Sequence, residues 1–500
     1  MNKKLKELKE ILAEVADLIG AQAVLSWDQQ TYMPAGGSES RGEQLSTLAR
    51  ITHEKFISPR IGELLDGLSR TASLQDPSSD DARLVRVTLR EYAKQTKIPS
   101  TWVAEFAQVT ALAQDAWVAA RVESNFARFQ PYLEKIVDLR QRYAEFFAPY
   151  DHVYDPLLDD FEPGLKTKEV EAIFLRLREE QVKLIKEISL KPQVDDSFIM
   201  KEYSESKQWD FGVEVITRFG YDWQNGRQDK AAHPFSTTFG YGDVRITTRF
   251  LHNNGVSSLF SSMHEAGHGM YEQGISKKLR RSLLFAGASM AIHESQSRMF
   301  ENLVGRSREF WIFFYPRFQT LMSENLANVP LEKFYKGINK VEPSLVRVES
   351  DEATYNLHIM LRLEIEIALM EGKLAVKDLP DVWNEKMKDY LGITPPDDAK
   401  GVLQDIHWSA GMLGYFPTYA LGNLVSAQLW EKILEDIPAL PTSIRSGDFL
   451  ELLAWLREKV HQHGAKYDPQ EMVQKITGSK ISPEPYLRYL KKKYTDIYNL

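Results

Sequence analysis

Apolar residues recur at three- and four-residue steps along much of the chain, which is the spacing of a helix that buries one face. Stripes of this kind occupy residues 5–19, 170–190, 310–322, 357–369 and 450–460. Pro316 lies inside the third stripe and predicts a kink or a helix start there. Gly464 follows the last stripe, where the C-terminal cap of a helix belongs. The pattern predicts a mostly α fold.

Residues 235–250 follow a different pattern. They are rich in β-branched and aromatic side chains, and Gly240 and Gly242 lie in the middle of the segment. This composition is typical of two strands joined by a tight turn. We therefore expect a small sheet or β-hairpin within an otherwise helical chain.

The chain of 500 residues has no internal repeat and no linker rich in Gly, Ser or Pro that is long enough to separate domains. Length alone favours two or three domains, but single large helical enzymes reach the same size. Because no linker is evident, we predict one domain that spans residues 1–500.

Composition narrows the chemistry. The chain has no cysteine, which excludes disulfides, thiolate metal sites and cysteine nucleophiles, so His and carboxylates must hold any transition metal. Lys and Arg number 62 and Asp and Glu 70, which gives a net charge of −8. The sequence has no long basic run, so a nucleic-acid partner is not expected. Charged residues recur through the first ten positions and continue at Lys9 and Glu10, where a signal peptide needs an apolar stretch, and no apolar run could span a membrane. We expect a cytoplasmic protein with no membrane contact.

Residues 264–268 match the pattern HExxH. On a helix, His264 and His268 lie on one face, so that both imidazoles can reach a single metal ion. Glu265 can then take a proton from water activated by that metal. With 11 His in the chain, roughly 0.02 chance matches to this pattern are expected, so the match is informative. No proline interrupts the predicted helix.

A hydrolytic zinc site needs a third protein ligand and an open position. Glu294 is the leading candidate, because it follows His268 by 26 residues and lies among apolar neighbours, where an unpaired carboxylate is costly to bury. Glu272 and Glu301 are the competing acids. His293 is a further possible ligand, although a hydrogen bond near the metal suits it better.

Six short motifs occur in order along the chain: HPF at 233–235, DxRxT at 243–247, HExxH at 264–268, HES/GQ at 293–296, IRxxAD at 346–351 and GxxQDxHW at 401–408. In these motifs the sequence resembles the thermostable carboxypeptidase 1 family of zinc metallocarboxypeptidases. Val346 and Ser350 depart from the IRxxAD motif, where the family has Ile and Ala, and both replacements are conservative.

The resemblance implies a site and an architecture. It implies zinc, with cobalt as a possible substitute, bound by His264, His268 and Glu294, with Glu265 as general base. It implies a large helical fold split by a deep groove, similar to neurolysin, with the N-terminal part (about 1–200) forming one side of the groove. It also implies a homodimer that removes C-terminal amino acids from peptides.

A carboxypeptidase must recognise a free C-terminal carboxylate, and the planar fork of arginine binds a carboxylate through two parallel hydrogen bonds. Arg347 and Arg245 both lie in family motifs. We favour Arg347 as the anchor, with Arg245 shaping the closed end of the groove. The competing interpretation is an internal ion pair, because Arg347 has acids nearby in the chain at Glu349, Asp351 and Glu352.

Other residues could support the reaction. Cleavage of an amide develops an oxyanion, and His407 with Tyr415 or Tyr419, which the sequence does not separate, could donate hydrogen bonds to it. The alternative for the tyrosines is packing in an aromatic turn. His233 could bond the substrate backbone or simply cap the chain before Pro234.

Two further features have simpler alternatives. Strand 244–248 or 235–239 could offer an edge to an extended peptide substrate, or the hairpin could merely close the groove wall. His461 and His463 form a pair beside Gly464, and a solvated helix end explains them better than a metal site does.

We therefore predict a zinc metallocarboxypeptidase that acts on peptides with a free C-terminus. An endopeptidase or oligopeptidase with the same zinc chemistry is the first alternative. A non-enzymatic helical scaffold, in which HExxH arises by chance, is the second.

Overall fold

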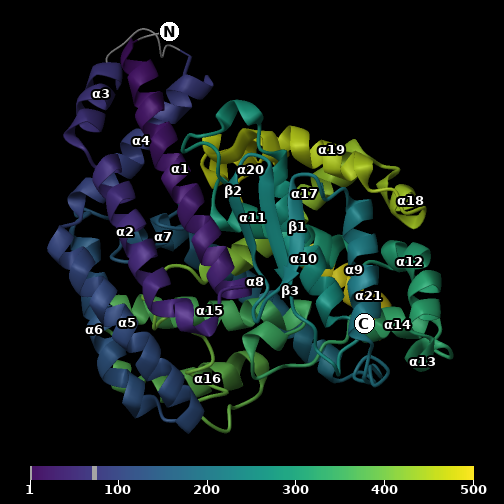
Figure 1. Cartoon of the computed structure of the whole chain (residues 1–500). Coiled ribbons are helices and arrows are strands. Elements are labelled where there is room, and N and C mark those ends of the chain that lie inside the picture. The colour runs from purple at the N-terminus through teal and green to yellow at the C-terminus, as the bar shows by residue number, and fades with distance from the viewer. Residues whose placement is uncertain (1–2, 70–75) are drawn as a thin grey trace.

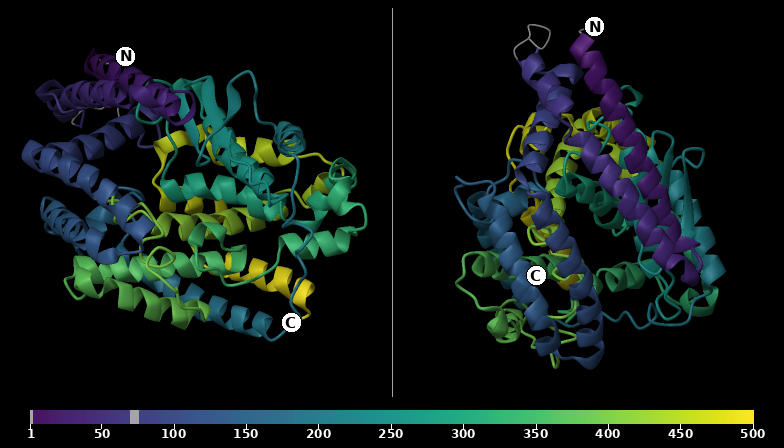
Figure 2. Two further views of the ribbon diagram at one scale, coloured as in Figure 1. Left: turned by 60° about the horizontal axis from the view of Figure 1, so that its bottom comes forward. Right: turned by 60° about the vertical axis from the view of Figure 1, so that its left-hand side comes forward.

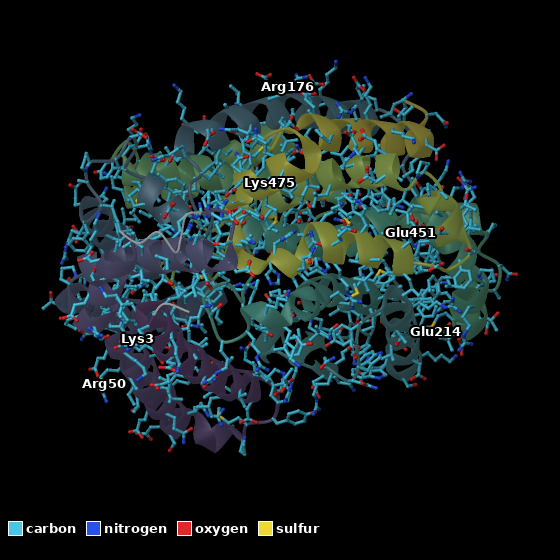
Figure 3. The ribbon with its side chains drawn as sticks, turned by 90° about the horizontal axis from the view of Figure 1, so that it is seen from above. Lys3, Arg50, Arg176, Glu214, Glu451 and Lys475 are labelled. Atoms are coloured by element: carbon cyan, nitrogen blue, oxygen red, sulfur yellow. The ribbon has the colours of Figure 1, made fainter. Side chains whose placement is uncertain are left out.

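The computed structural model describes residues 3–69 and 76–500. Long helices dominate it, and one small sheet lies near its centre (Figure 1). Charged side chains such as Arg50 and Arg176 project from the outside of the molecule (Figure 3). Within the described ranges, none of the helices is long and apolar enough to cross a membrane. The predicted mostly α fold with a small sheet is confirmed.

The N-terminal helices pack along one flank, where α1 and α2 lie side by side (Figures 1 and 2, purple). They are α1 (Lys3–Thr31), α2 (Ser38–Phe56), α3 (Pro59–Ser69), α4 (Asp80–Lys97), α5 (Ser100–Glu123) and α6 (Phe126–Glu145). The predicted stripe on α1 is buried from Leu5 to Val15, whereas Ile19 is 50% exposed. A small core joins α1, α3 and α4 to residues 275–284.

The remaining helices surround the larger core. Before the sheet come α7 (Asp155–Asp159), α8 (Thr167–Ser189) and α9 (Glu205–Phe219). After it come α10 (Ser257–Gly274), α11 (Met290–Arg298), α12 (Arg308–Leu321), α13 (Ser323–Leu326), α14 (Leu331–Ile338), α15 (Glu352–Met370) and α16 (Leu379–Leu391). The chain ends with α17 (Pro417–Asp436), α18 (Leu440–Arg445), α19 (Leu450–Lys459), α20 (Pro469–Thr477) and α21 (Glu484–Tyr498). Helix α8 packs on α15 and α21, so the N-terminal and C-terminal parts share this core.

The other four predicted stripes form α8, α12, α15 and α19. Helix α15 is buried almost all round rather than along one face, since even Arg362 and Glu366 are fully buried. Pro316 lies within α12 and does not start it. The prediction for Gly464 is wrong: α19 ends at Lys459, and Gly464 lies in the following 3-10 segment, with a φ of 51°.

The sheet has three strands, β1 (Gly226–Lys230), β2 (Ser236–Gly240) and β3 (Asp243–Thr248), in the order β1–β3–β2. Strands β2 and β3 form the predicted hairpin, while β1 runs parallel to β3. The sequence of β1 is polar and lacks an apolar alternation, so the pattern did not predict it. Because β3 is the central strand, it offers no free edge, and the suggestion that 244–248 is an edge is wrong.

The sheet lies between α10 and α1. Ile246 of β3 packs so close to Gly269 of α10 that a Cβ there would come within 3.1 Å of it. On the other side, Gly20 of α1 allows the helix to approach the carbonyl oxygen of Phe239, which a Cβ would meet at 2.5 Å. This packing fixes α10, which carries the HExxH residues, against the sheet.

Helix α11 is held between α10 and α17 by two glycines. A Cβ at Gly267 of α10 would lie 2.6 Å from the carbonyl oxygen of Gln296, and a Cβ at Gly422 of α17 would lie 2.5 Å from Cγ of Glu294. Real side chains do not tolerate such distances, so these helices are in contact only because both positions lack a side chain. The position of Glu294 relative to α10 depends on this close packing.

We expect Gly267→Ala to lower the free energy of unfolding by about 1–3 kcal/mol, because the added methyl group overpacks the contact between α10 and α11. The matched control is Gly42→Ala in α2, where a Cβ meets nothing within 4 Å; it should be neutral or stabilising by up to about 1 kcal/mol. Thermal and denaturant unfolding of both variants measure the difference. Equal stability of the Gly267→Ala protein and the wild type would contradict the packing argument.

Candidate metal centre

Three side chains from two helices converge on one point. His264 and His268 lie one turn apart on α10, and Glu294 lies on α11. Their donor atoms all lie within 4.8 Å of one another. Oε2 of Glu294 is 3.7 Å from Nε2 of His264 and 3.5 Å from Nε2 of His268. The residues that the sequence singled out as metal ligands are therefore brought together.

The spacing of these donors suits a metal ion better than direct contact. At 3.5 and 3.7 Å the nitrogens and the oxygen are too far apart for good hydrogen bonds. A tetrahedral ion with bonds of about 2.0–2.1 Å separates its ligands by roughly 3.3 Å. The His264 and His268 side chains also remain 19% and 16% exposed, so the cluster is open on one side. The residues present thus fit a zinc-type site.

The carboxylate of Glu294 is held in its charged form. Burial would raise its pKa, but the charges of Arg298 and His264 outweigh burial and hold the pKa well below its ordinary value. Nε of Arg298 donates to Oε1 of Glu294 at 2.6 Å, which leaves Oε2 directed at the histidines. Metal binding needs a deprotonated carboxylate, and this environment provides one.

Glu301, a competing ligand in the sequence, lies on the other side of His264. It belongs to a π-helical turn, η4 (Met299–Val304), that continues α11. Oε2 of Glu301 is 2.9 Å from Nδ1 of His264, and Arg298 contacts the same oxygen at 3.2 Å. Glu301 thus fixes the ring of His264 from the side opposite the cluster.

Glu272, the second competing acid, is also outside the cluster. Nδ1 of His268 is 2.6 Å from Nδ1 of His293, and Nε2 of His293 is 2.7 Å from Oε1 of Glu272. His293 therefore makes hydrogen bonds behind the ligand His268, while its neighbour Glu294 faces the cluster.

Glu265 lies beside the first ligand and is only 6% exposed. Burial raises the pKa of its carboxyl group to about 7. A carboxyl group with a pKa near neutrality can both accept and release a proton at physiological pH.

The region around Tyr419 faces the same cluster. The hydroxyl of Tyr419 lies 3.3 Å from Nε2 of His407, and the ring of Tyr415 lies 5.3 Å from that of Tyr419. Burial, with a contribution from the charge of Glu294, raises the pKa of Tyr415 to about 12. Burial also lowers the pKa of His407 to about 4. At neutral pH the tyrosines keep their protons and the imidazole is uncharged.

Arg347 is buried and its guanidinium is anchored by an acid that the sequence did not suggest. Its Nε and Nη2 donate to Oδ1 of Asp405 at 3.1 and 2.7 Å, and its Nη1 donates to the hydroxyl of Tyr355 at 2.9 Å. Arg362, fully buried, donates to the other oxygen of Asp405. The guanidinium of Arg347 also lies 4.9 Å from the ring centroid of Tyr419. Tyr355, which accepts its hydrogen bond, lies with its ring 4.5 Å from the guanidinium of Arg298, the partner of Glu294.

Arg245 and His233 are not part of these interactions. Arg245 pairs with Asp243 through two hydrogen bonds, and its guanidinium lies 4.6 Å from the ring centroids of both Trp27 and Phe239. Side chains alternate along β3, and Ile246 faces α10, so the sheet lies between Arg245 and α10. His233 is exposed in the loop between β1 and β2.

Comparison with known proteins identifies the family. The profile of the Carboxypeptidase Taq (M32) metallopeptidase family matches residues 7–494. The chain belongs to this family. It is 41% identical over 503 residues to thermostable carboxypeptidase 1 of Thermus thermophilus, with 99% of this chain and 98% of that protein covered. It is 39% identical over 498 residues to carboxypeptidase 1 of Bacillus subtilis, with 99% of each covered.

A solved structure agrees with this assignment. The M32 carboxypeptidase of Deinococcus radiodurans is 38% identical and superimposes with a TM-score of 0.97 over the full length of both chains. The family that the six motifs indicated is confirmed, and the protein is a metallocarboxypeptidase that acts on peptides. The alternative of a non-enzymatic scaffold is wrong.

The interpretation of His461 is also wrong. His461 is fully buried, its ring lies 5.2 Å from that of Tyr271, and its Nε2 is 2.9 Å from Oε1 of Gln296 on α11. It therefore supports α11, the helix that carries Glu294, and is not a solvated cap. His463 is partly buried against the ring of Tyr467.

The sequence did not point to several residues that surround His264, His268 and Glu294. Arg298 could have been found, because it follows Glu294 by four residues, one helical turn. Asp405 lies inside a quoted motif but received no role. Tyr355 follows Arg347 by eight residues but lies outside the quoted motifs, and Trp27 is far in the chain from its partner Arg245, so neither carries a local signal.

The geometry predicts that the two acids that flank His264 contribute differently to zinc affinity. Glu294→Gln should weaken zinc binding by more than the roughly 10- to 100-fold that an outer hydrogen-bond partner contributes, whereas Glu301→Gln should stay within that range. Titration of the metal-free protein with zinc against a chromogenic chelator measures both affinities. A larger loss for Glu301→Gln than for Glu294→Gln would exchange the two roles.

Proposed function

We propose that this metallocarboxypeptidase uses one zinc ion per chain, held by Nε2 of His264, Nε2 of His268 and Oε2 of Glu294. The observation that carries the proposal is the convergence of these three donors within 4.8 Å. Hydrolytic zinc sites combine three protein ligands of these types with one open position. Cobalt accepts the same ligands and can replace zinc.

A zinc ion in this site supplies Lewis-acid chemistry toward water and the peptide carbonyl. Glu265 accepts a proton from the attacking water and then passes it to the departing amine. Its position next to His264 and its pKa near 7 support both transfers. The buried carboxyl group is thus the proton carrier of the reaction.

Hydrogen-bond donors near Tyr419 stabilise the oxyanion that develops on the scissile carbonyl. His407 is within 3.3 Å of the Tyr419 hydroxyl, and Tyr415 lies beside it. Both tyrosines keep their phenolic protons, which makes either one a competent donor. The charge of Glu294 contributes to the pKa of each, which supports their placement beside the metal ligands.

Arg347 binds the C-terminal carboxylate of the substrate. Two arginines, Arg347 and Arg362, share the single carboxylate of Asp405, so this buried group carries one uncompensated positive charge. A buried charge without a partner is costly, and a substrate carboxylate compensates it. Asp405 holds the guanidinium of Arg347 in a fixed orientation for this contact.

The remaining assignments concern residues outside the metal cluster and outside the group around Arg347. We assign to Arg245, rigid between Trp27 and Phe239, the closed end of a deep groove. His233 and residues 235–239, most of which belong to the edge strand β2, are assigned to the substrate backbone. The N-terminal part, about 1–200, forms one wall in this proposal. Residue swaps at these positions should change the preferred peptide length more than the metal affinity.

The working enzyme is further proposed to be a cytoplasmic homodimer, as the family resemblance implies. Its substrates are peptides with a free C-terminus, and neither nucleic acid nor membrane takes part. Sedimentation equilibrium gives the mass in solution, which should be twice that of the 57.4 kDa chain. A concentration-independent monomer that retains full activity would contradict the dimer.

Replacement of Glu265 by Gln should retain zinc and lower kcat by roughly 100- to 10,000-fold, because a general base contributes about that much. Metal content by plasma mass spectrometry and steady-state hydrolysis of a blocked dipeptide measure the two effects separately. An active Glu265→Gln enzyme with a full complement of zinc would assign the base to another residue.

The role of Arg347 predicts how the enzyme treats a peptide whose C-terminus is amidated. The wild type should lose roughly 10- to 100-fold in kcat/KM on amidation, since charge-assisted hydrogen bonds to the carboxylate are lost. Arg347→Lys keeps the positive charge and the partner Asp405 but loses the planar guanidinium that binds a carboxylate through two hydrogen bonds. The ratio of kcat/KM for the free-acid peptide to that for the amidated peptide should therefore be smaller in this variant.

Unchanged discrimination in the Arg347→Lys enzyme would remove Arg347 from carboxylate binding. Full-rate cleavage of the amidated peptide by the wild type would instead favour the endopeptidase or oligopeptidase alternative. The two results are separate, because the first compares enzymes and the second compares substrates.

A further inference from the structure

The two histidines of the cluster are supported in different ways. Nδ1 of His264 meets the carboxylate of Glu301 directly, at 2.9 Å. Nδ1 of His268 meets another imidazole, that of His293, at 2.6 Å, and only then a carboxylate, that of Glu272, at 2.7 Å. The second arrangement inserts a residue of α11 between two residues of α10.

We infer that His268, His293 and Glu272 form a hydrogen-bond relay that positions His268 for the metal. This inference rests on the proposed zinc site. His293 is a positioning residue in it, since it would act on the metal through His268.

One arrangement of protons satisfies the relay when His268 binds a metal through Nε2. Nε2 of His268 must then be unprotonated, so Nδ1 carries the proton and donates it to Nδ1 of His293. Nδ1 of His293 is therefore bare, and its proton lies on Nε2, from which it is donated to Glu272. The tautomer of each histidine fixes that of the next. Because the carboxylate of Glu272 can only accept, the hydrogen bonds are donated from His268 to His293 and from His293 to Glu272.

The surroundings keep the relay in place. The ring of His293 lies 5.0 Å from that of Tyr271, and a Cβ at Gly287 would approach its Cδ2 to 2.7 Å, so the ring has little room to turn. Oε2 of Glu272 is buried and takes no hydrogen bond from any described residue. Among the described residues, the side-chain hydrogen bond of the Glu272 carboxylate is therefore the one to His293, and a charged acceptor strengthens that bond.

The relay also ties the ligands of two helices together. Glu272 and His268 are four residues apart on α10, while His293 immediately precedes the third ligand, Glu294, on α11. A shift of α11 along α10 would break the contacts of His293 and move Glu294 at the same time. The relay thus couples the orientation of His268 to the position of Glu294.

The test uses three substitutions in the full-length protein. His293→Ala removes both contacts; His293→Asn keeps an acceptor near the Nδ1 position but does not reach Glu272; Glu272→Gln keeps the hydrogen bond but removes the charge. His152→Ala is the matched control, because His152 makes a similar contact to Glu371 at 3.2 Å on the surface. Zinc affinity is measured against a chromogenic chelator, and the tautomer of His268 by ¹⁵N NMR of the metal-free protein labelled in histidine.

We expect zinc binding to weaken by about 10- to 100-fold in His293→Ala and by less in His293→Asn and Glu272→Gln. The His152→Ala control should bind like the wild type. In the metal-free wild type, His268 should carry its proton on Nδ1, and His293→Ala should lose this preference. Unchanged affinity in all three variants, or a wild-type His268 protonated on Nε2 alone, would overturn the relay.

The same experiment separates this inference from the proposed function. A wild-type protein that binds no zinc contradicts the metal site, yet the NMR measurement in the metal-free protein still decides whether the relay exists. Should His293→Ala fail to fold, the Asn and Gln variants decide the question by the same two measurements.

Discussion

The close contact of α11 with α10 and α17 is the constraint on which the site depends. Gly267 and Gly422 lack side chains at the two places where these helices meet. Without that contact, the carboxylate of Glu294 would lie too far from the two imidazoles to share an ion with them. The two histidines of α10 and Glu294 of α11 can share one metal ion only because α10, α11 and α17 pack closely at these two glycines.

Charge compensation is the second requirement, because a buried carboxylate or guanidinium without a partner is costly. Arg298 faces both Glu294 and Glu301, and Arg306 approaches Glu301 at 3.8 Å. Glu294 and Glu301 therefore each contact a cation, and a bound metal ion would add positive charge next to Glu265. The group around Asp405 has the opposite balance, with one positive charge in excess, which suits an anionic end of a substrate.

Much of the fold and part of the site followed from local patterns in the sequence. The stripe from Leu5 to Val15 predicted α1, because burial on one face imposes a period on the sequence. The β-branched and aromatic residues of 235–250, with Gly240 and Gly242 between them, predicted a hairpin. The HExxH spacing predicted two donors on one helix face. Its spacing and apolar neighbours made Glu294 the leading third ligand, the family resemblance implied the same residue, and the structure buries it in α11.

What the sequence did not reveal depends on contacts between distant segments. Strand β1 is polar and is recognised only by its pairing with β3. The burial of His461 follows from Gln296, 165 positions away in the chain. The contact of Trp27 with Arg245 joins α1 to the sheet, and no local pattern in the sequence predicts it. Such partners are set by the packing of the whole chain, which no window of residues contains.

Anomalous diffraction from crystals of the zinc-loaded enzyme, collected on both sides of the zinc absorption edge, locates any zinc ion bound between α10 and α11. We expect one strong peak per chain, with Nε2 of His264, Nε2 of His268 and an oxygen of Glu294 each about 2.0–2.2 Å from it. A peak bound by other residues, or no peak between these three side chains, would contradict the proposed zinc site.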